Sequence, residues 1–468
     1  MDQIKNTNII LLGVTGDLTA KKIMPALFNL WKKGALPKNV NIIGFGRREL
    51  SSQEFLSFIK DLLVKKLKIS DIEFETFSTQ LSYVQGLFDE QESYKKLSLH
   101  LESLEQTQFD VQRLFYLAVP PEIYETIFTN LDQSGLGQGG EKKVETKILV
   151  EKPFGKDLQT AEDLDKLLGM LFQEHQIYRI DHYLAKEMIQ NVLTFRFSND
   201  IFEKIWNNQF IEKIEIRTWE TLGVEQRGAF YDAVGTLRDV GQNHLLQMLA
   251  LITMDAPLDY SSQAIQLKRA QIMSTLKPLS DEQIKAQTYR AQYSGFEKIE
   301  GVKETSQTET YFKVKTELFH QRWEGVPIYM EAGKRMKEQI KDIVVTFKHE
   351  ENCICPPGQH YTNRIIFSLE PDEGIKIDFW SKKPGLEMAI EKRSLEFMLR
   401  QKSDSVQYVE EYEKLLLDSV RGDQTLFVST SEVKSTWAFI DHIVAGWGKG
   451  LVPLNKYNPD SNPEVNIF

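Results

Sequence analysis

Residues 178–191, YRIDHYLAKEMIQN, bring together side chains that could bind an anion or hold a catalytic base. His182 and Lys186 are four residues apart, so a helix beginning here would place them on one face, with Tyr183 as a further donor. Donors at a helix N-terminus suit a phosphate, because the positive end of the helix dipole attracts an anion. The alternative is an Asp181 that caps the helix among exposed charges, and the segment alone favours that alternative.

A second group of reactive residues surrounds His244 in LRDVGQNHLLQML, on the apolar stripe of a helix predicted over residues 235–254. A histidine on an apolar face is more often a core residue than a catalyst. Oxidation of an alcohol by hydride transfer, however, needs a base, because the oxygen must lose its proton as the carbon loses hydride. Such a histidine requires a carboxylate to hold its tautomer, and the two candidates are Asp239 and Asp181.

The turn GVTGDL (13–18) lies between the apolar run NIILLGV and a predicted helix that ends near Lys33. Gly13 would make the tight turn, and Gly16 would let the backbone approach a pyrophosphate. The full G-x-G-x-x-G pattern is absent, so the motif alone fits a plain turn equally well. Its place in the first βα unit of the chain favours a nucleotide site.

The next apolar run, NVNIIGFG (39–46), ends in Arg47 and Arg48. Folds specific for NAD usually place Asp or Glu here, whereas guanidinium groups suit the 2′-phosphate of NADP. Glu49 follows and weakens this inference, and a solvated strand end is the alternative. The sequence therefore favours NADP over NAD and leaves the use of both coenzymes open.

The elements that must position these residues form two groups. Up to residue 180, the apolar runs 8–14, 39–46, 113–121 and 146–155 alternate with helical segments, which predicts a parallel sheet. Beyond residue 310, the runs TYFKVKTELF, DIVVTFKHE, NRIIFSLEP and GIKIDFW alternate in polarity, which predicts an antiparallel sheet. Segment 258–308 is expected to be a helical surface excursion. We therefore predict an α/β plus α+β fold: a Rossmann-like, doubly wound dinucleotide domain (1–180), and a substrate domain (181–468) with a large, mainly antiparallel sheet and helices.

The composition excludes several classes of protein. A chain of 468 residues favours two domains, and 41% hydrophobic with 26% charged residues is typical of a globular protein. The net charge of -10 argues against nucleic-acid and anionic-membrane partners. The apolar run before Asp17 is too short for a signal peptide or a membrane span. Cys353 and Cys355 suit neither a disulfide with each other nor a metal site, so we expect a reduced, cytoplasmic protein with no metal.

Six motifs, in this order, resemble those of glucose-6-phosphate dehydrogenases: GVTGDLTAKKIMPALFNLW, YLAVPPEIY, VEKPFG, YRIDHYLAKEMIQN, RDVGQNHLLQML and RWEGVPIYMEAGK. RIDHYLxKE and RDVxQNHLLQ are specific to that family, whereas EKP is shared with other sugar oxidoreductases. The resemblance covers nearly the whole chain. It implies oxidation of D-glucose 6-phosphate at C1 to 6-phospho-D-glucono-1,5-lactone with hydride transfer to NADP, the first step of the oxidative pentose phosphate pathway. It also implies a homodimer, or a dimer of dimers, formed through the sheet of the second domain.

The resemblance also assigns roles to single residues. It implies that His244 is the general base, that Asp181 orients it, and that Lys152 lies between sugar and nicotinamide. It places the substrate phosphate on His182, Tyr183 and Lys186. It places the sugar hydroxyls near Glu220, Asp239 and Lys334. The residues that match the coenzyme site are Gly13, Thr15, Gly16, Asp17, Leu18, Arg47, Tyr124 and Lys152.

The chain departs from the family pattern beside the phosphate site. Glu331 and Ala332 precede Gly333 where the family usually has Arg and a small residue, and Gln339 stands where a second basic residue is common. The C-terminal end does not resemble that of animal enzymes with a second, structural NADP, so we expect only the catalytic coenzyme. Two alternatives remain: a related sugar or sugar-phosphate dehydrogenase, and a catalytically silent NADP-binding sensor. The cluster at residues 182–186 argues against an enzyme for neutral sugars, which would not need it. The presence of His244 and Asp181 argues against a silent sensor, which would have lost its base.

Overall fold

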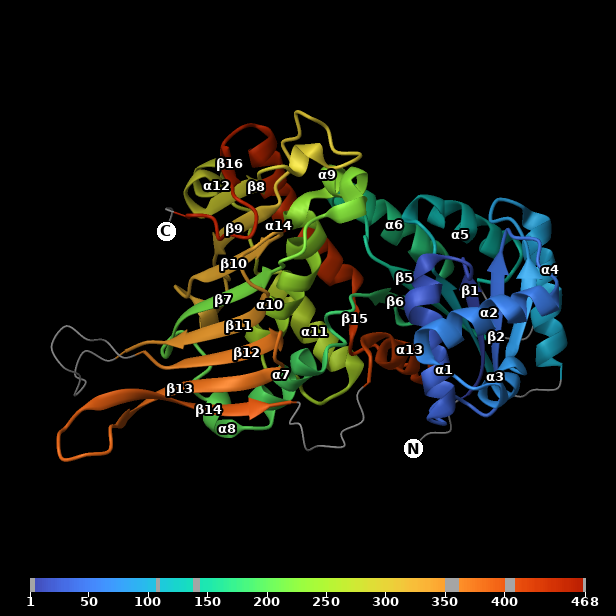
Figure 1. The fold of residues 1–468 in the computed structure, drawn as a ribbon, viewed down its shortest axis with the longest axis horizontal. Coiled ribbons are helices and arrows are strands. Elements are labelled where there is room, and N and C mark those ends of the chain that lie inside the picture. The colour runs from blue at the N-terminus through green and yellow to red at the C-terminus, as the bar shows by residue number, and fades with distance from the viewer. Residues whose placement is uncertain (1–4, 107–109, 138–143, 350–361, 400–408, 466–468) are drawn as a thin grey trace.

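The computed structural model describes residues 5–106, 110–137, 144–349, 362–399 and 409–465. Two β-sheets lie at opposite ends of the molecule, and helices of the second half of the chain lie between them (Figure 1). Cys353 and Cys355, and the prediction made for them, fall outside the described residues.

The first sheet has the strand order β15-β6-β5-β4-β1-β2-β3, and all its pairs are parallel except that of β15 with β6. Its strands are β1 Asn6–Leu12, β2 Val40–Gly46, β3 Leu81–Gln85, β4 Val111–Leu117, β5 Glu145–Glu151, β6 Ile177–Ile180 and β15 Phe427–Val428. Its helices are η1 Thr19–Ile23, α1 Met24–Lys32, α2 Ser52–Leu67, α3 Asp71–Ser78, α4 Gln91–Glu105, α5 Tyr124–Gln133 and α6 Leu158–Leu171. Strand order reverses between β1 and β4, and doubly wound sheets bind ligands at such a point, beyond the carboxyl ends of the strands.

The second sheet has the order β14-β13-β12-β11-β7-β10-β9-β8-β16. It is antiparallel except for the pairs β7–β10 and β8–β16. Its strands are β7 Ile211–Trp219, β8 Thr288–Tyr293, β9 Tyr311–Thr316, β10 Ile328–Gly333, β11 Ile340–Phe347, β12 Arg364–Glu370, β13 Gly374–Lys382, β14 Ile390–Met398 and β16 Leu454–Tyr457. The accompanying helices are α7 Glu187–Phe197, α8 Asp200–Glu203, α9 Gly228–Thr236, η5 Leu237–Leu245, α10 Leu246–Thr253, α11 Ser262–Met273, α12 Asp281–Gln287, α13 Glu411–Arg421 and α14 Thr430–Gly448.

This architecture confirms the predicted α/β plus α+β fold, and the four runs predicted beyond residue 310 are β9, β11, β12 and β13. The expectation for segment 258–308 is only partly right. Helices α11 and α12 lie there, but so does β8, which pairs with both β9 and β16. Pattern reasoning missed β8 because its inward positions include Arg290 and Gln292, which are buried polar residues satisfied by hydrogen bonds to backbone carbonyls.

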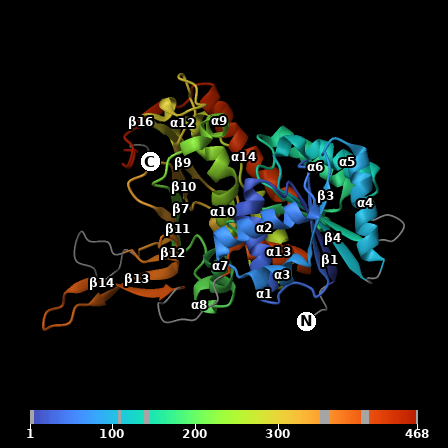
Figure 2. The same ribbon diagram turned by 45° about the vertical axis from the view of Figure 1, so that its right-hand side comes forward.

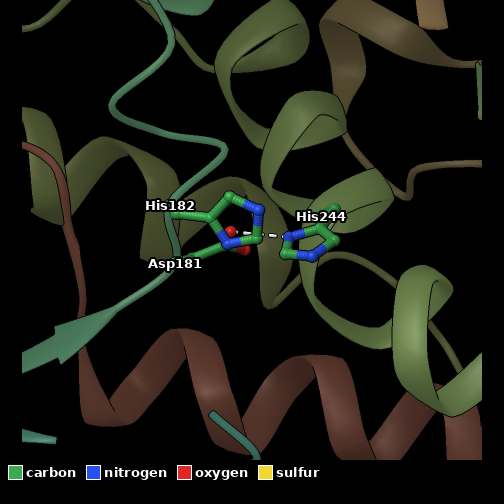
Figure 3. A group of neighbouring side chains, drawn as sticks. All are labelled: Asp181, His182 and His244. Carbon is green, nitrogen blue, oxygen red and sulfur yellow. Dashed lines mark hydrogen bonds and ion pairs between the residues drawn. The ribbon is translucent and has the colours of Figure 1, made fainter. Parts of the chain in front are cut away.

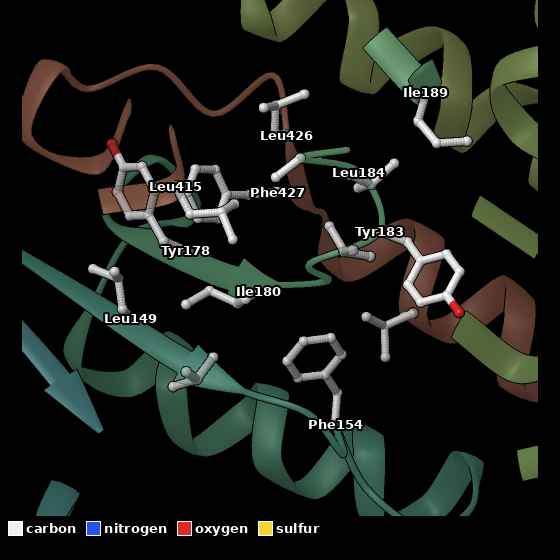
Figure 4. Close-up of a cluster of buried hydrophobic side chains, with 14 of the residues drawn as sticks. Leu149, Phe154, Tyr178, Ile180, Tyr183, Leu184, Ile189, Leu415, Leu426 and Phe427 are labelled. Carbon is white, nitrogen blue, oxygen red and sulfur yellow. The ribbon is translucent and has the colours of Figure 1, made fainter. Parts of the chain in front are cut away.

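The two halves share one hydrophobic core. The C-terminal part of the chain returns to the first sheet through α13 and β15, and Phe427 packs edge-on against Tyr178 with ring centroids 4.8 Å apart. Figure 4 shows this cluster, which also contains Leu184 and Leu415. Each large apolar side chain buried here contributes about 1.5–3 kcal/mol, so the loop that follows β6 is held firmly. Domain limits of 1–180 and 181–468 stay a prediction, since β15 completes the first sheet from the far end of the chain.

Candidate active site

The segment that follows β6 is a series of tight turns rather than the first turn of a helix. Backbone N–H groups of Leu184, Ala185 and Lys186 each donate to the carbonyl three residues earlier. Helix α7 begins only at Glu187, with Lys186 as its N-cap residue. The expectation that His182 and Lys186 share a helix face is therefore wrong, and so is the alternative of an N-capping Asp181. The turns instead bring His182, Tyr183 and Lys186 to the wall of one cavity.

His244 lies on an unusual helix. Gly235, at φ +77°, kinks the chain near the end of α9, just before the π-helical segment η5, and a Cβ at residue 235 would lie 2.5 Å from Glu309 Oε1. In a π-helix the backbone joins residues i and i+5, so Asp239 and His244 stand one turn apart. Lys152, from the end of β5, spans them: its Nζ lies 3.0 Å from both the Asp239 carbonyl oxygen and His244 Nε2. π-Helical turns are rare and concentrate at functional sites.

His244 and Asp181 form a close buried pair (Figure 3). His244 Nδ1 lies 2.6 Å from Asp181 Oδ1, which also accepts from the Tyr183 N–H at 3.0 Å. Because a carboxylate only accepts, Nδ1 carries the proton and Nε2 has the free lone pair. Burial, helped by the charge of Lys152, holds the pKa of His244 well below its usual range, and burial raises the pKa of Asp181. The imidazole is thus a neutral, oriented acceptor.

The neighbouring rings close the site around this base. Tyr183 stacks on His244, with ring centroids 3.8 Å apart, and His182 meets it edge-on at 5.0 Å. Burial and the proximity of His244 lower the pKa of His182 to about 3, so this ring is neutral as well. Ligand atoms of Asp181, His182 and His244 lie within 4.8 Å of one another, a spacing that a metal could use. The short Asp181–His244 bond already pairs two of those atoms, which fits a base and its orienting carboxylate better.

Nε2 of His244 faces a polar cavity of about 450 Å³. Its walls contain every residue that the sequence assigns to the substrate: Lys152, His182, Tyr183, Lys186, Glu220, Asp239 and Lys334. Asp181 lies behind His244. Lys334 forms an ion pair with Glu220. Burial opposes the charge of Asp239, but Lys152 and Lys334 outweigh it and lower the pKa of that carboxyl. The cavity therefore presents ionised groups of both signs, as recognition of a polyhydroxylated anion requires.

Several wall residues were missed by the sequence analysis: Lys22, Arg227, Glu370, Glu411 and Tyr412. Lys341, two residues after Gln339, also lines the cavity, whereas Lys337 is exposed and does not line it. The missed acidic residues stand at the end of β12 and the start of α13. No local pattern marks them, because only the packing of these distant elements brings them to the cavity.

A second cavity, of about 580 Å³, adjoins the first and runs along the carboxyl end of β4. Leu18, Lys152, His182 and Asp239 line both cavities. Gly13, at φ +89°, closes the turn before the first helix, and a Cβ there would lie 2.5 Å from the Ala118 carbonyl oxygen. Only glycine fits such a turn, which brings backbone N–H groups to the position that a pyrophosphate takes in dinucleotide folds. The residues present therefore fit a dinucleotide.

Of the residues predicted for the coenzyme, Leu18 and Lys152 line this cavity and the others do not. Arg47 and Arg48 are exposed after β2, and neither forms an ion pair with any residue that the structure describes. Thr15 belongs to the Gly13–Gly16 turn, and Asp17 is exposed and paired with Lys21. Tyr124 is buried with its hydroxyl 3.5 Å from the Glu151 carbonyl oxygen, and it does not line the cavity.

A doubly wound sheet with a dinucleotide turn, next to an oriented histidine base, defines a pyridine-nucleotide-dependent oxidoreductase. Comparison with protein families then narrows the class. The model "Glucose-6-phosphate dehydrogenase, NAD binding domain" matches residues 10–191, and "Glucose-6-phosphate dehydrogenase, C-terminal domain" matches residues 193–465. The chain belongs to the glucose-6-phosphate dehydrogenase family.

Individual relatives agree over almost their whole length. The chain is 38% identical to the glucose-6-phosphate 1-dehydrogenase of Borreliella burgdorferi, with 99% of this chain and 96% of the relative covered. It is 36% identical to glucose-6-phosphate 1-dehydrogenase 6, cytoplasmic, of Arabidopsis thaliana, over 97% and 88% of the two chains. Among solved structures, a glucose-6-phosphate dehydrogenase in complex with its substrate glucose-6-phosphate superposes with a TM-score of 0.91 at 30% identity, over 100% and 96% of the chains. Within the described residues, none of the helices has the length and apolar character needed to cross a membrane.

Proposed function

We propose that this protein oxidises D-glucose 6-phosphate at C1 to 6-phospho-D-glucono-1,5-lactone, with NADP as the coenzyme. The observation that carries the proposal is one cavity with an oriented base on one wall and the lysine Nζ groups of Lys186 and Lys341 on another. A substrate whose phosphate binds the lysines would have its reacting carbon held at a fixed distance from His244 Nε2. Such orientation replaces an encounter in solution and lowers the barrier by several kcal/mol.

The protein groups divide the proton chemistry between them. His244 Nε2 takes the proton of the C1 hydroxyl, while Asp181 holds the ring and stabilises the imidazolium that forms. Lys152, whose Nζ lies 3.0 Å from Nε2, donates a hydrogen bond to the same oxygen once its ammonium group has moved aside for the substrate. Residues of the adjoining cavity hold the coenzyme, which supplies the acceptor for the hydride of C1.

The preference for NADP rests on Arg47 and Arg48. Both guanidinium groups are exposed beyond β2, at the edge where a dinucleotide's adenosine ribose lies in this fold. Planar guanidinium groups bind phosphates through two parallel hydrogen bonds, which a ribose 2′-hydroxyl cannot offer. Glu49 adds a carboxylate that could accept a hydrogen bond from the ribose hydroxyl of NAD. The ratio of the rates with NADP and with NAD therefore measures which of the two preferences is stronger.

The experiment that tests the function is absorbance at the reduced-nicotinamide band with purified protein. Glucose 6-phosphate is tested with NADP and with NAD, and glucose serves as the unphosphorylated control. We expect reduction with the phosphorylated sugar and a higher rate with NADP. Absence of reduction with both coenzymes would favour a silent NADP sensor, and a faster reaction with glucose would favour a related dehydrogenase of neutral sugars.

Changing Lys186 to alanine is expected to lower kcat/KM for glucose 6-phosphate by about 100-fold while changing that for glucose little, because a charge-assisted hydrogen bond contributes ~1.5–3 kcal/mol. The loss also leaves Glu370 and Glu411 without one of their cations, which adds repulsion against the phosphate. Steady-state kinetics with both sugars measure this. The exposed Lys166→Ala change is the matched control, and an equal loss for both sugars would remove Lys186 from the phosphate site.

We also propose self-association through the second sheet. Strands β13 and β14 project from the body of the molecule in both views (Figures 1 and 2). Their segment exposes Leu386, Met388, Leu395 and Phe397. Exposed apolar side chains gathered on one projecting element are typical of a protein–protein interface. Sedimentation of the protein as a monomer at micromolar concentration would contradict the proposal, and the choice between dimer and tetramer follows from the same measurement.

A further inference from the structure

A carboxylate bridges the two lysines of the substrate cavity. Glu370, the last residue of β12, accepts from Lys186 Nζ at Oε1 (3.0 Å) and from Lys341 Nζ at Oε2 (2.9 Å). Gln339 Nε2 donates to the same Oε2 at 2.8 Å. The two ammonium groups also lie 5.5 Å and 5.4 Å from the centroid of the Tyr183 ring. A planar anion thus already binds both cations, as one end of a substrate phosphate would.

The charges of this subsite are balanced before any ligand enters. Lys186 and Lys341 face Glu370, and Glu411 lies 3.3 Å from Lys186. Burial alone would raise the pKa of Glu370, but Lys341, Gln339 and Lys186 lower it to about 2. The carboxylate is therefore ionised at every pH at which the protein would work. A dianionic phosphate that approached the lysines would meet it as a like charge in a partly buried cavity, where repulsion is weakly screened.

The Glu370 side chain has space to withdraw. It also lines an adjoining cavity of about 430 Å³, which His244 does not line, together with Lys22, Asp372 and Glu373. Its side chain is 27% exposed, so it is held by its ion pairs and not by close packing on all sides. Exchange of one anion for another can then proceed by rotation of a single side chain, with the lysines left in place.

We propose that Glu370 is an internal competitor of the substrate phosphate, which keeps Lys186 and Lys341 positioned and sets the affinity of the cavity for phosphorylated sugars. Lys341 is the second cation of the phosphate subsite. It takes the role of the basic residue that is common at position 339, where this chain has the uncharged Gln339. Substrate phosphate displaces the Glu370 carboxylate toward the adjoining cavity and takes over both ammonium groups. This inference rests on the proposed function, because it assumes a phosphorylated ligand in this cavity.

The test measures binding by calorimetry, with glucose 6-phosphate and glucose as the two probes. Glu370→Gln keeps the shape of the side chain and removes its charge. We expect the Kd for glucose 6-phosphate to fall by about 5- to 20-fold, because juxtaposed like charges are costly, and the Kd for glucose to stay unchanged. Glu396→Gln, which alters an exposed carboxylate paired with Lys376 on the same sheet, is the matched control and should bind like the parent protein.

A double variant separates competition from mere support of the lysines. Combining Glu370→Gln with Lys341→Gln should abolish the gain, because the gain acts through the released Lys341. Weaker binding of glucose 6-phosphate by Glu370→Gln would mean that the carboxylate only positions the lysines, and it would overturn the proposal. Unchanged binding would overturn it as well. If Glu370→Gln does not fold, Lys341→Gln alone decides: it must weaken binding of glucose 6-phosphate and spare glucose. Failure of the parent protein to reduce NADP would refute the proposed function. Normal turnover by the parent, together with weaker or unchanged binding by Glu370→Gln, would refute this inference alone.

Discussion

Replacing His244 by asparagine is expected to lower kcat by about 10³- to 10⁴-fold, the largest effect of any single change in this protein. Nε2 of His244 is the acceptor that faces the cavity, and the asparagine amide cannot take a proton at neutral pH. The side chain is shorter but can still donate toward Asp181, so the buried carboxylate keeps a partner. Substrate binding should change little, because the phosphate is held by lysines on another wall.

Single-turnover kinetics measure the chemical step, and calorimetry with glucose 6-phosphate measures binding. The exposed His175→Asn change provides the control for the same substitution far from the cavity. Turnover that persists within about tenfold of the parent enzyme would exclude His244 as the base, since a general base contributes at least ~10²-fold. Lost binding with lost turnover would instead indicate that the variant is misfolded or that His244 contacts the sugar.

Changing Asp181 to asparagine is expected to lower kcat by about 10³-fold or more, because the imidazolium that forms on His244 loses the carboxylate that stabilises it. Oδ1 of Asp181 accepts from His244 Nδ1 and from the Tyr183 backbone. The carbonyl oxygen of an asparagine can accept from the same two donors, so the tautomer of His244 is kept, but the amide carries no negative charge. The imidazolium that forms when Nε2 takes the proton then has no carboxylate to stabilise it, although the fold and the cavity are unchanged.

The kinetic parameters of the variant distinguish this explanation from a packing defect. Loss of the stabilising charge lowers kcat with little change in KM for glucose 6-phosphate, whereas a displaced loop would also disturb His182 and Lys186 and raise KM. Asp259→Asn, an exposed site, is the matched control.

Since burial lowers the pKa of His244, the parent enzyme should keep its base neutral well below the ordinary histidine range. Loss of the parent enzyme's activity as the pH is lowered, beginning already above pH ~7, would contradict that assignment.

The fold class and the residues of the reactive centre could be predicted from the order of the amino acids. Uninterrupted apolar runs predicted the parallel sheet, because its strands are buried on both faces. Runs that alternate in polarity predicted the antiparallel sheet, because its strands are buried on one face. Gly13 was identifiable because only glycine tolerates its backbone conformation. His244 and Asp181 were named because a base needs an orienting carboxylate, although Asp239 was an equal candidate by pattern.

The local residue pattern left both carboxylates open, and the family resemblance implied Asp181; in the folded chain Asp181 contacts Nδ1 of His244, while Asp239 contacts Lys152. Tertiary structure also showed that His182 and Lys186 lie on a turn and not on a helix face, since local spacing cannot distinguish the two when the helix begins at Glu187. The strand β8 was hidden by buried polar side chains that find partners only in the folded chain. Glu370, Glu411 and Lys341 reach one cavity from three distant elements, and contacts of that kind depend on packing, which no local pattern of residues records.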